Sequence, residues 1–392
     1  MKLNPLEKTA TVRHSIDFKN KMKIWHVGSK NSPKRSSGIT TTIWAVAKEQ
    51  AKLGHQVTII VEEYPPKPEE LALAEQIGVE LKYIPATRWQ HDPKIMESLL
   101  QSTPPQIVNI HGSFLPNLAT CAMTLRRHKI PYVVTPNGML NFRRSRFKKI
   151  LYSWLLEKQM VAAAKAITLV IPAEIDMIKA VVPRYRGITR YISNPVESDQ
   201  LDAFKKTDWK VNPETKRLVY LGSFDVGRKG LDVLVEIARH LPEAEFHLYG
   251  YQDRPELQSE LDQLQSNLPP NVYFHGPVFD AEKVAILTSA SLYIQTSRWE
   301  GFPVSIAEAM YLGIPCAISD MPNVGAFFRE QDLGLVLPPD PQAAANRLQE
   351  VLNKPELQQH WAERGQTFAQ ENFQSRAVAS KYLKVYEEVL NP

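Results

Sequence analysis

Short apolar runs alternate with longer stretches of helical periodicity along most of this 392-residue chain, and no other feature constrains the fold as strongly. The pattern predicts parallel strands joined by helices, because a strand that re-enters a parallel sheet needs a long crossover. A polar segment at 194–214 separates two series of predicted strands. The first series comprises 23–27, 57–61, 107–111, 132–135 and 167–171; the second comprises 217–222, 246–250, 272–275, 292–295, 315–318 and 334–337.

The length is sufficient for two hydrophobic cores, so each series is expected to form its own doubly wound, Rossmann-like α/β domain. We place a polar lead-in at 1–20, the first domain at 21–193, the second at 194–375 and a C-terminal helix at 376–392. Ligands of open parallel sheets bind at the carboxyl ends of the strands, and two such edges would face each other across a cleft. Site residues are therefore expected where strands end and helices begin.

Composition argues against several classes of function. The formal net charge of +5 is modest for this length and argues against a nucleic-acid binder. The N-terminus lacks the apolar core of a signal peptide, and no apolar run reaches the ~18 residues of a membrane span. The two cysteines, Cys121 and Cys316, form no metal-spaced pair, and the sequence has no D-x-D or H-E-x-x-H motif. We therefore expect a cytoplasmic protein without a metal or other cofactor.

Two glutamates lie in the otherwise apolar stretch SRWEGFPVSIAEAMYLGIP at 297–315. A strand ends at Gln295, and Pro303 suits the first turn of the following helix. Glu300 would lie at the mouth of that helix, where backbone N–H groups and the helix dipole favour an anion. Glu308 would lie about 7–8 Å further along the helix axis, so one elongated ligand could contact both carboxylates.

The Glu308 carboxylate needs partners, because its helix is apolar nearly all round and burying an unpaired charge is costly. A vicinal diol such as a ribose would supply two hydrogen-bond donors. A structural salt bridge to a lysine or arginine from elsewhere is an equally good explanation from spacing alone.

A basic turn follows the first strand of the second series, in YLGSFDVGRKGLDVL at 220–234. Arg228 and Lys229 would lie just before a helix, where they could clamp a diphosphate. The spacing is not that of a P-loop, since Lys229 is displaced by one position and no Ser or Thr follows it. The alternative is two solvated bases on a surface loop.

Two further positions lie at the expected ligand-binding edge of the first domain. His111 ends its strand and could hydrogen-bond a substrate hydroxyl or carbonyl group, although an isolated histidine is more often only a hydrogen-bonded core residue. Gly38 ends the loop 28–38 and would allow close backbone approach to a ligand, or the segment is simply a flexible surface loop.

A basic cluster, RRSRFKK at 143–149, precedes an amphipathic stretch. Such a cluster could rest on an anionic membrane, or it could be the solvated start of a helix. Its cationic residues are Arg143, Arg144, Arg146, Lys148 and Lys149.

The segment EGFPVSIAEAM, followed by GIP, resembles the signature of retaining, GT-B fold glycosyltransferases of glycosyltransferase family 4. The resemblance extends over nearly the whole chain from Lys23, through LGHQVTII, IVNIHGSF, YVVTPNGML, LGSFDVGRKGLDVL, VYFHGPV and YLKVYEEVL. It implies two Rossmann-like domains facing across a cleft, with the C-terminal helix crossing back to pack on the N-terminal domain.

The resemblance also implies roles for residues of the second domain. Glu308 would hold the ribose hydroxyls of a nucleotide-sugar, and Glu300 would contact the donor sugar. Arg228 and Lys229 would neutralise the departing diphosphate. Ser223 stands where family members often have an arginine, so one phosphate contact would shift to Arg228.

Other roles follow in the same way. Phe302 and Val304 would offer backbone N–H groups to the sugar or phosphate, whereas Pro303, between them, has none to offer. Val278 would lie near the base. In the first domain, Gly38 would let the backbone approach the phosphates, and His111 would lie near the sugar hydroxyls and the reacting centre.

The expected function is transfer of a sugar from a nucleotide-diphosphate sugar to an acceptor hydroxyl with retention of configuration. The expected partners are this donor and a glycan or lipid-linked glycan acceptor, with no nucleic acid. The basic cluster adds peripheral contact with an anionic membrane at the inner face of the plasma membrane as an open alternative to a solvated helix start. The alternatives are a GT-B fold epimerase or hydrolase and a non-catalytic nucleotide-sugar binding subunit. A dinucleotide-dependent oxidoreductase is disfavoured because the G-x-G-x-x-G fingerprint is missing.

Overall fold

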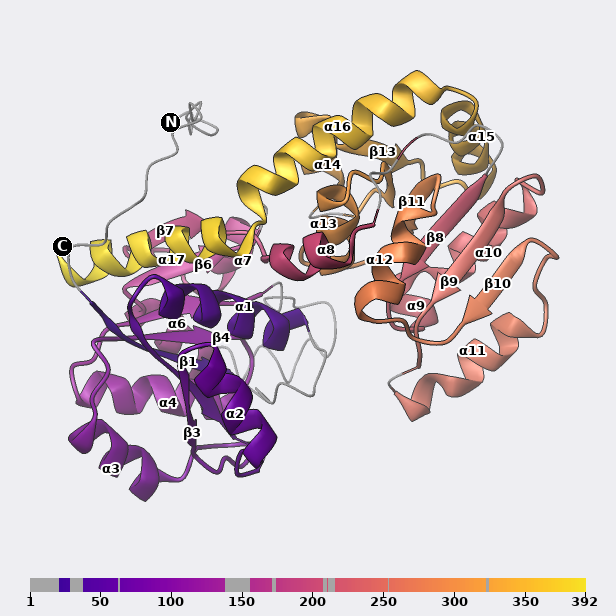
Figure 1. Ribbon diagram of the computed structural model, residues 1–392. Coiled ribbons are helices and arrows are strands. Elements are labelled where there is room, and N and C mark those ends of the chain that lie inside the picture. The colour runs from indigo at the N-terminus through magenta and orange to yellow at the C-terminus, as the bar shows by residue number, and fades with distance from the viewer. Residues whose placement is uncertain are drawn as a thin grey trace.

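Two parallel sheets, each flanked by helices, make up the computed structural model (Figure 1). The structure describes residues 21–28, 38–62, 64–137, 156–170, 174–206, 210, 216–252, 254–321 and 324–392. The expected lead-in at 1–20, most of the loop 28–38 and the basic cluster 143–149 lie outside the described residues. The predicted α/β architecture with two doubly wound sheets is confirmed.

The N-terminal sheet has seven parallel strands in the order β3-β2-β1-β4-β5-β6-β7. Side chains alternate along each strand, so that Trp25 and Val27 of β1 enter one core and Ile24 enters the other. The strands are β1 Lys23–Gly28, β2 Gln56–Val61, β3 Val79–Tyr83, β4 Ile107–His111, β5 Tyr132–Thr135, β6 Ala166–Leu169 and β7 Ile188–Tyr191.

Helices cover both faces of this sheet. One face carries α3 Pro93–Ser102, α4 Pro116–Arg127, α6 Lys158–Ala163 and α7 Glu174–Val181. The other face carries α1 Gly38–Lys52, α2 Pro68–Gln76 and α17 Ser375–Leu390.

The C-terminal sheet has six parallel strands in the order β10-β9-β8-β11-β12-β13. They are β8 Arg217–Leu221, β9 Glu245–Tyr249, β10 Val272–His275, β11 Leu292–Gln295, β12 Cys316–Ser319 and β13 Gly334–Leu337. One core contains α10 Leu231–Arg239, α11 Gln258–Gln265 and α15 Pro341–Leu352. The opposite core contains α8 Ser198–Phe204, α12 Asp280–Thr288, α13 Val304–Tyr311, α14 Gly325–Gln331 and α16 Pro355–Asn372.

All six strands predicted for the second series are present, whereas β3 and β7 of the first sheet were not predicted. Both are edge strands, with sequences VELKY and ITRY and partly exposed side chains. An edge strand is only half covered, so it lacks the continuous apolar run that marks a central parallel strand.

The chain crosses between the two domains twice, and the two crossings are bonded to each other. The Val196 N–H donates to the Phe373 carbonyl at 2.7 Å, and the Ser375 hydroxyl donates to the Val196 carbonyl at 2.5 Å. After the second crossing α17 runs back over the N-terminal domain and packs beside α1 (Figure 1). The two segments therefore form one short, hydrogen-bonded connection.

A band of buried polar side chains lies beneath α1 and α17. The His26 ring contacts His111 (Nδ1 to Nε2, 2.9 Å) and Gln50 (Nε2 to Oε1, 2.8 Å). The Asn109 amide donates to the Tyr386 hydroxyl at 2.8 Å. Buried polar groups must find such partners, so the band fixes the two helices in position on the sheet.

Burial keeps both histidines of this band neutral. Desolvation lowers the pKa of His26 to about 4, against the weaker opposing effect of its hydrogen bond to Gln50. Desolvation also holds the pKa of His111 well below its ordinary value, and the neighbouring His26 adds to this effect. Both rings are therefore uncharged at neutral pH.

Acidification should destabilise the protein through His26. Its pKa is about 4 in the folded state and 6.5 in the reference state, so the unfolded chain binds the proton first as the pH falls. Stability is full above the unfolded value and declines towards the folded one, by roughly 3 kcal/mol in total. Between about pH 7 and about pH 5, the thermal midpoint should fall less in His26→Asn than in the wild type.

The matched control is His240→Asn, which replaces an exposed histidine at the end of α10. This variant should keep the wild-type pH dependence. A His26→Asn protein with an unchanged slope would contradict the prediction.

Candidate active site

A cleft of about 550 Å³ opens between the two domains. Its walls come from the turns after β8, β9, β10 and β11 and from α12 and α13, with Ile39 of α1, Asn137 after β5 and Asn194 of the interdomain connection on the other side. This is the carboxyl edge of the C-terminal sheet, where ligands of open α/β sheets bind. Nine of the predicted site residues line the cleft: Ser223, Arg228, Lys229, Val278, Glu300, Phe302, Pro303, Val304 and Glu308.

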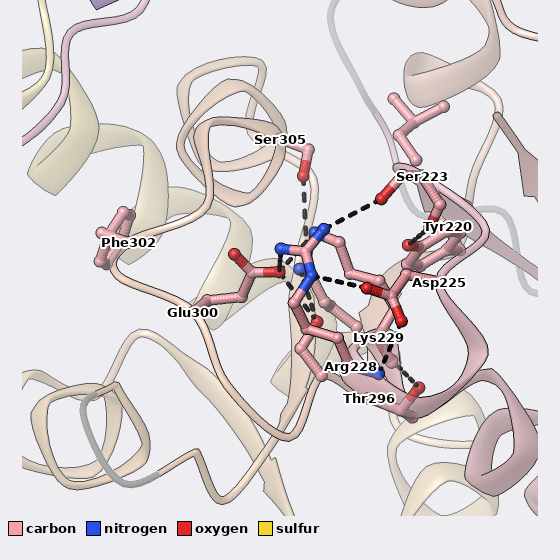
Figure 2. A network of polar contacts seen from close by, with 12 residues as sticks. Tyr220, Ser223, Asp225, Arg228, Lys229, Thr296, Glu300, Phe302 and Ser305 are labelled. Atoms are coloured by element: carbon pink, nitrogen blue, oxygen red, sulfur yellow. Dashed lines mark hydrogen bonds and ion pairs between the residues drawn. The ribbon is translucent and has the colours of Figure 1, made fainter. Parts of the chain in front are cut away.

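Pro303 and Phe302 fix the conformation of the turn that carries Glu300. Pro303, in an extended conformation, is the N-cap of α13, and the Phe302 ring packs against Phe373 with centroids 5.0 Å apart. Figure 2 shows the Phe302 side chain pointing away from the basic residues, while Glu300 points towards them. The buried ring anchors the turn, so only the backbone of Phe302 can serve a ligand.

Arg228 and Lys229 lie on the short helix α9 Val226–Lys229, which follows β8. The buried Asp225 carboxylate caps this helix, accepting from the Arg228 N–H at 3.1 Å and from Arg228 Nε at 3.0 Å. Arg254 also pairs with Asp225. One buried acid therefore sets both the turn and the direction of the Arg228 side chain.

Gly230 ends this turn and allows the neighbouring strand to approach. Its φ of 64° is left-handed, and a Cβ there would lie 2.2 Å from the Thr296 carbonyl oxygen. The Thr296 hydroxyl in turn donates to the Gly230 carbonyl at 2.8 Å. Only glycine fits this position without displacing the backbone.

Glu300 joins the basic turn to the glutamate turn. Its carboxylate pairs with Lys229 and lies 3.5 Å from Arg228, whose other guanidinium nitrogen donates to the Ser223 hydroxyl at 3.1 Å (Figure 2). The side chains of Lys229 and Glu300 are only 11% and 13% exposed. The two residue groups that the sequence suggested separately thus form one polar network.

The Glu308 carboxylate forms an ion pair with Lys283 of α12, with Oε1 and Nζ 2.6 Å apart. Both residues also line the cleft. The salt bridge and the ligand-facing position, which the sequence presented as alternatives, are therefore both present. One carboxylate oxygen contacts Lys283, and a carboxylate can accept several further hydrogen bonds.

The charges around the cleft favour an anionic ligand. Three cations that line it, Arg228, Lys229 and Lys283, meet two carboxylates, Glu300 and Glu308, while Arg254, outside the lining, pairs with the buried Asp225. The first turn of α13 adds backbone N–H groups at the same place. A diphosphate would find positioned cations and N–H donors here.

Two predicted residues do not line the cleft among the described residues. Gly38 is the first residue of α1, and its neighbour Ile39 contributes to the wall instead. His111 ends β4 as predicted but is only 1% exposed, and its ring contacts His26 within the polar band. Their suggested contacts with a donor stay predictions.

Several cleft residues were not predicted. Tyr249 and Tyr251 flank the carboxyl end of β9, and the strand-end rule, applied to FHLYG, would have found them. Lys283 and Asn194 gave no local signal. Asn194 donates to the Phe302 carbonyl at 3.1 Å across the domain boundary, a contact that only the tertiary structure creates.

Within the described ranges, no helix is both long enough and apolar enough to pass through a bilayer. Over the same residues, no cluster of three or more His, Cys, Asp or Glu side chains is placed to hold a metal ion.

The fold and cleft define a class: a two-domain α/β protein with a positively charged site at facing sheet edges. Two family models match, "Glycosyl transferase 4-like domain" over residues 37–194 and "Glycosyl transferases group 1" over residues 202–368. Together they cover most of the chain. It belongs to this glycosyltransferase family, with the GT-B fold, and the predicted resemblance is confirmed.

Curated relatives align with about half of the chain. The phosphatidyl-myo-inositol mannosyltransferase of Mycobacterium tuberculosis is 29% identical over 208 residues, which are 50% of this chain and 53% of the relative. The N-acetyl-alpha-D-glucosaminyl L-malate synthase of Bacillus anthracis is 26% identical over 188 residues, 47% of this chain and 49% of the relative. The matches thus span about half the length of these proteins.

Solved structures match over nearly the whole fold. Anabaena Alr3699/HepE in complex with UDP and glucose superposes with a TM-score of 0.72 at 15% identity, covering 94% of this chain and 100% of that one. Sucrose-phosphate synthase from Thermosynechococcus elongatus gives 0.73 at 18% identity, covering 94% and 99%. At such identities the likeness establishes the fold.

Gly230→Ala should destabilise the C-terminal domain by at least about 2 kcal/mol. The alanine would have to adopt an unfavourable left-handed backbone conformation, and its Cβ would clash with the Thr296 carbonyl oxygen. Gly227→Ala is the matched control on the same turn, since a Cβ there meets no atom within 4 Å. Thermal unfolding of the two variants would measure the difference. Equal midpoints would show that the Gly230 turn is not constrained as described.

Proposed function

We propose that the protein transfers a hexose from a nucleotide-diphosphate sugar to a hydroxyl of a glycan or lipid-linked glycan, with retention at the anomeric carbon. The observation that carries this proposal is the joining of Arg228, Lys229 and Glu300 in one network at the mouth of α13. Family membership supports the reaction class. The product would belong to polysaccharide, lipopolysaccharide or other glycoconjugate synthesis.

Expulsion of the diphosphate is the step that this site is best arranged to assist. As the bond from the anomeric carbon to the phosphate oxygen breaks, negative charge grows on the leaving group. Arg228, Lys229 and the first N–H groups of α13 lie where they would stabilise that charge without reorganising. Asp225 and Ser223 hold the Arg228 guanidinium in place beforehand.

Retention at the anomeric carbon needs either two successive displacements through an enzyme nucleophile or attack by the acceptor on the face from which the diphosphate leaves. The Glu300 carboxylate is paired with Lys229, which lowers its nucleophilicity, so we assign it to binding the donor sugar. The acceptor oxygen bonds to the anomeric carbon on the leaving-group side as that group departs. The acceptor proton passes to an oxygen of the leaving phosphate, so that no enzyme base is required.

Glu308 would bind the ribose of the donor, and the turn near Val278 would contact the base. Glu308 keeps hydrogen-bonding capacity beyond its pair with Lys283, so two ribose hydroxyls could donate to it. Tyr249 and Phe279 flank this end of the cleft. The structural neighbour Alr3699/HepE was solved with UDP and glucose, and this supports a uridine nucleotide as the first donor to test.

We also propose a cytoplasmic location and metal-independent chemistry. Both cysteines are free and buried, which fits a reducing compartment. The positioned lysine and arginine side chains supply the positive charge that a metal would otherwise provide at the diphosphate. Peripheral contact with an anionic membrane through residues 143–149 stays a prediction from the sequence.

The first experiment is a thermal-shift screen against UDP-, GDP- and ADP-hexoses, each with and without a chelator. A donor present at about 100 times its Kd should stabilise the protein by about 2.7 kcal/mol. Stabilisation with turnover only when an acceptor is added supports a transferase. Rapid hydrolysis or epimerisation of the donor without an acceptor would support a GT-B fold hydrolase or epimerase. Binding of the donor without any turnover would support a non-catalytic nucleotide-sugar binding subunit.

Lys229→Met should lower kcat by roughly 100-fold or more, because it removes a cation from the leaving group's position.

Glu308→Gln should mainly raise the donor KM, because its contacts are with a part of the donor that does not react.

The control for both variants is Arg329→Met, which removes an exposed arginine of α14 that pairs with Asp320 and does not line the cleft. Steady-state kinetics on the three variants would measure these effects. Wild-type turnover in Lys229→Met would exclude the proposed clamp.

A further inference from the structure

The side chain of Asn194 joins the two domains beside the cleft. Asn194 lies on the first crossing between the domains and lines the cleft. Its amide nitrogen donates to the Phe302 carbonyl of the C-terminal domain at 3.1 Å. Its amide oxygen accepts from the Thr42 hydroxyl of α1, in the N-terminal domain, at 3.4 Å. One side chain therefore bridges the two domains.

The residue type suits this double contact. A carbonyl oxygen can only accept a hydrogen bond, so the amide nitrogen of Asn194 must face Phe302, and the amide oxygen is left to face the Thr42 hydroxyl. An aspartate would have no N–H group for the carbonyl, and a serine would be too short to reach both partners. Asn194 also precedes Pro195, which confines the Asn194 backbone to extended conformations and so limits the positions open to its side chain.

The turn that Asn194 holds is the one that carries Glu300. Phe302 contacts both crossings: its carbonyl accepts from Asn194 on the first, and its ring packs against Phe373 on the second, with centroids 5.0 Å apart. The two crossings are bonded to each other through Val196. The turn is thus fixed to the interdomain connection by its backbone and by a buried ring. A displacement of the connection would therefore displace Glu300.

The other end of the contact lies near the start of α1. Thr42 is buried and follows the cleft-lining Ile39 by three positions, which places both on the same face of the helix. The hydrogen bond from Thr42 therefore holds the face of α1 that borders the cleft. Further along α1, the exposed Lys52 pairs with Asp199 of α8 at 3.0 Å across the same boundary.

We propose that Asn194 is a positioning residue that holds α1 of the N-terminal domain in place against the turn carrying Glu300, and so sets the two sides of the cleft for the transfer reaction. The effect on transfer rests on the proposed function. The charged residues assigned to the donor, including Arg228, Lys229 and Glu308, lie on the C-terminal domain. Donor binding is therefore independent of the bridge. Attack by the acceptor is not, because it needs both sides of the cleft aligned.

The first test separates donor binding from turnover. In Asn194→Ala we expect kcat to fall by about tenfold, as for the loss of one aligned hydrogen bond. The Kd of the nucleotide-hexose selected by the thermal-shift screen, measured by calorimetry, should change by less than about twofold. Asn194→Ser should behave in the same way, and it serves if the alanine variant does not fold. A loss of donor affinity as large as the loss of kcat would overturn the proposal, because Asn194 would then bind the donor itself.

A double-mutant cycle tests whether Asn194 acts through Thr42. Thr42→Val removes the hydroxyl and keeps the branched shape of the side chain. We expect the double variant Asn194→Ala, Thr42→Val to be no slower than the slower single variant, since both changes break the same bridge. Fully additive losses would overturn the proposal.

The matched control is Lys52→Met, which removes the exposed ion pair between α1 and α8. It should leave kcat unchanged, because exposed ion pairs contribute little. A loss of kcat in Lys52→Met equal to that in Asn194→Ala would overturn the proposal, since any change between α1 and the connection would then slow the reaction.

The bridge can also be measured on the full-length protein without substrate. Spin labels on Lys94→Cys of α3 and Gln263→Cys of α11, both exposed positions, report the distance between the domains by double electron–electron resonance. The two native cysteines are buried and stay unlabelled. We expect a narrow distance distribution with Asn194 present and a broader one in Asn194→Ala. An unchanged distribution would overturn the proposal.

Failure of the proposed function is distinguishable from these results. If the wild type neither binds nor turns over any nucleotide-sugar, the transferase assignment fails. The distance measurement still reports whether Asn194 holds the two domains together.

Discussion

The pairing of β8 with β11 is the constraint on which the rest of the site depends. These strands lie side by side in the C-terminal sheet although about seventy residues separate them. Parallel strands bring their carboxyl ends to one edge, so the turn after β8, with Arg228 and Lys229, meets the turn after β11, with Glu300. Gly230 permits this approach and Asp225 fixes the orientation of the basic turn.

The ion pairs in the cleft are positioned before any ligand arrives. Lys229 is held by Glu300, and Lys283 by Glu308, with all four side chains at least partly withdrawn from water. Folding has already placed these lysine side chains before a diphosphate enters the site. Such preorganised cations stabilise the charge that develops on a leaving group without having to move. The same carboxylates limit repulsion among the lysines and arginines when the cleft is empty.

In the N-terminal domain, buried hydrogen bonds between polar side chains fix helices α1 and α17 on the sheet. The polar band joins β4 to β1 and α1 through His26, and joins β4 to α17 through Asn109, so the last helix of the chain is bonded to the same strand as the first helix beside it. The two interdomain crossings are bonded to each other beside it. The position of His111 at the ligand-binding edge is thus coupled to the packing of a helix that lies far away in the sequence.

The sequence by itself determined the two α/β domains, all the central strands and the two turns that carry the charged residues, because each depends on local periodicity or on proline and glycine at fixed positions. It missed the edge strands β3 and β7, which lack a continuous apolar run. It could not choose between a salt bridge and a ligand for Glu308, since Lys283 comes from another helix. Only the tertiary structure decided that Glu308 faces the cleft while paired, and that His111 is buried against His26, because such contacts depend on how strands are ordered in a sheet and not on their spacing along the chain.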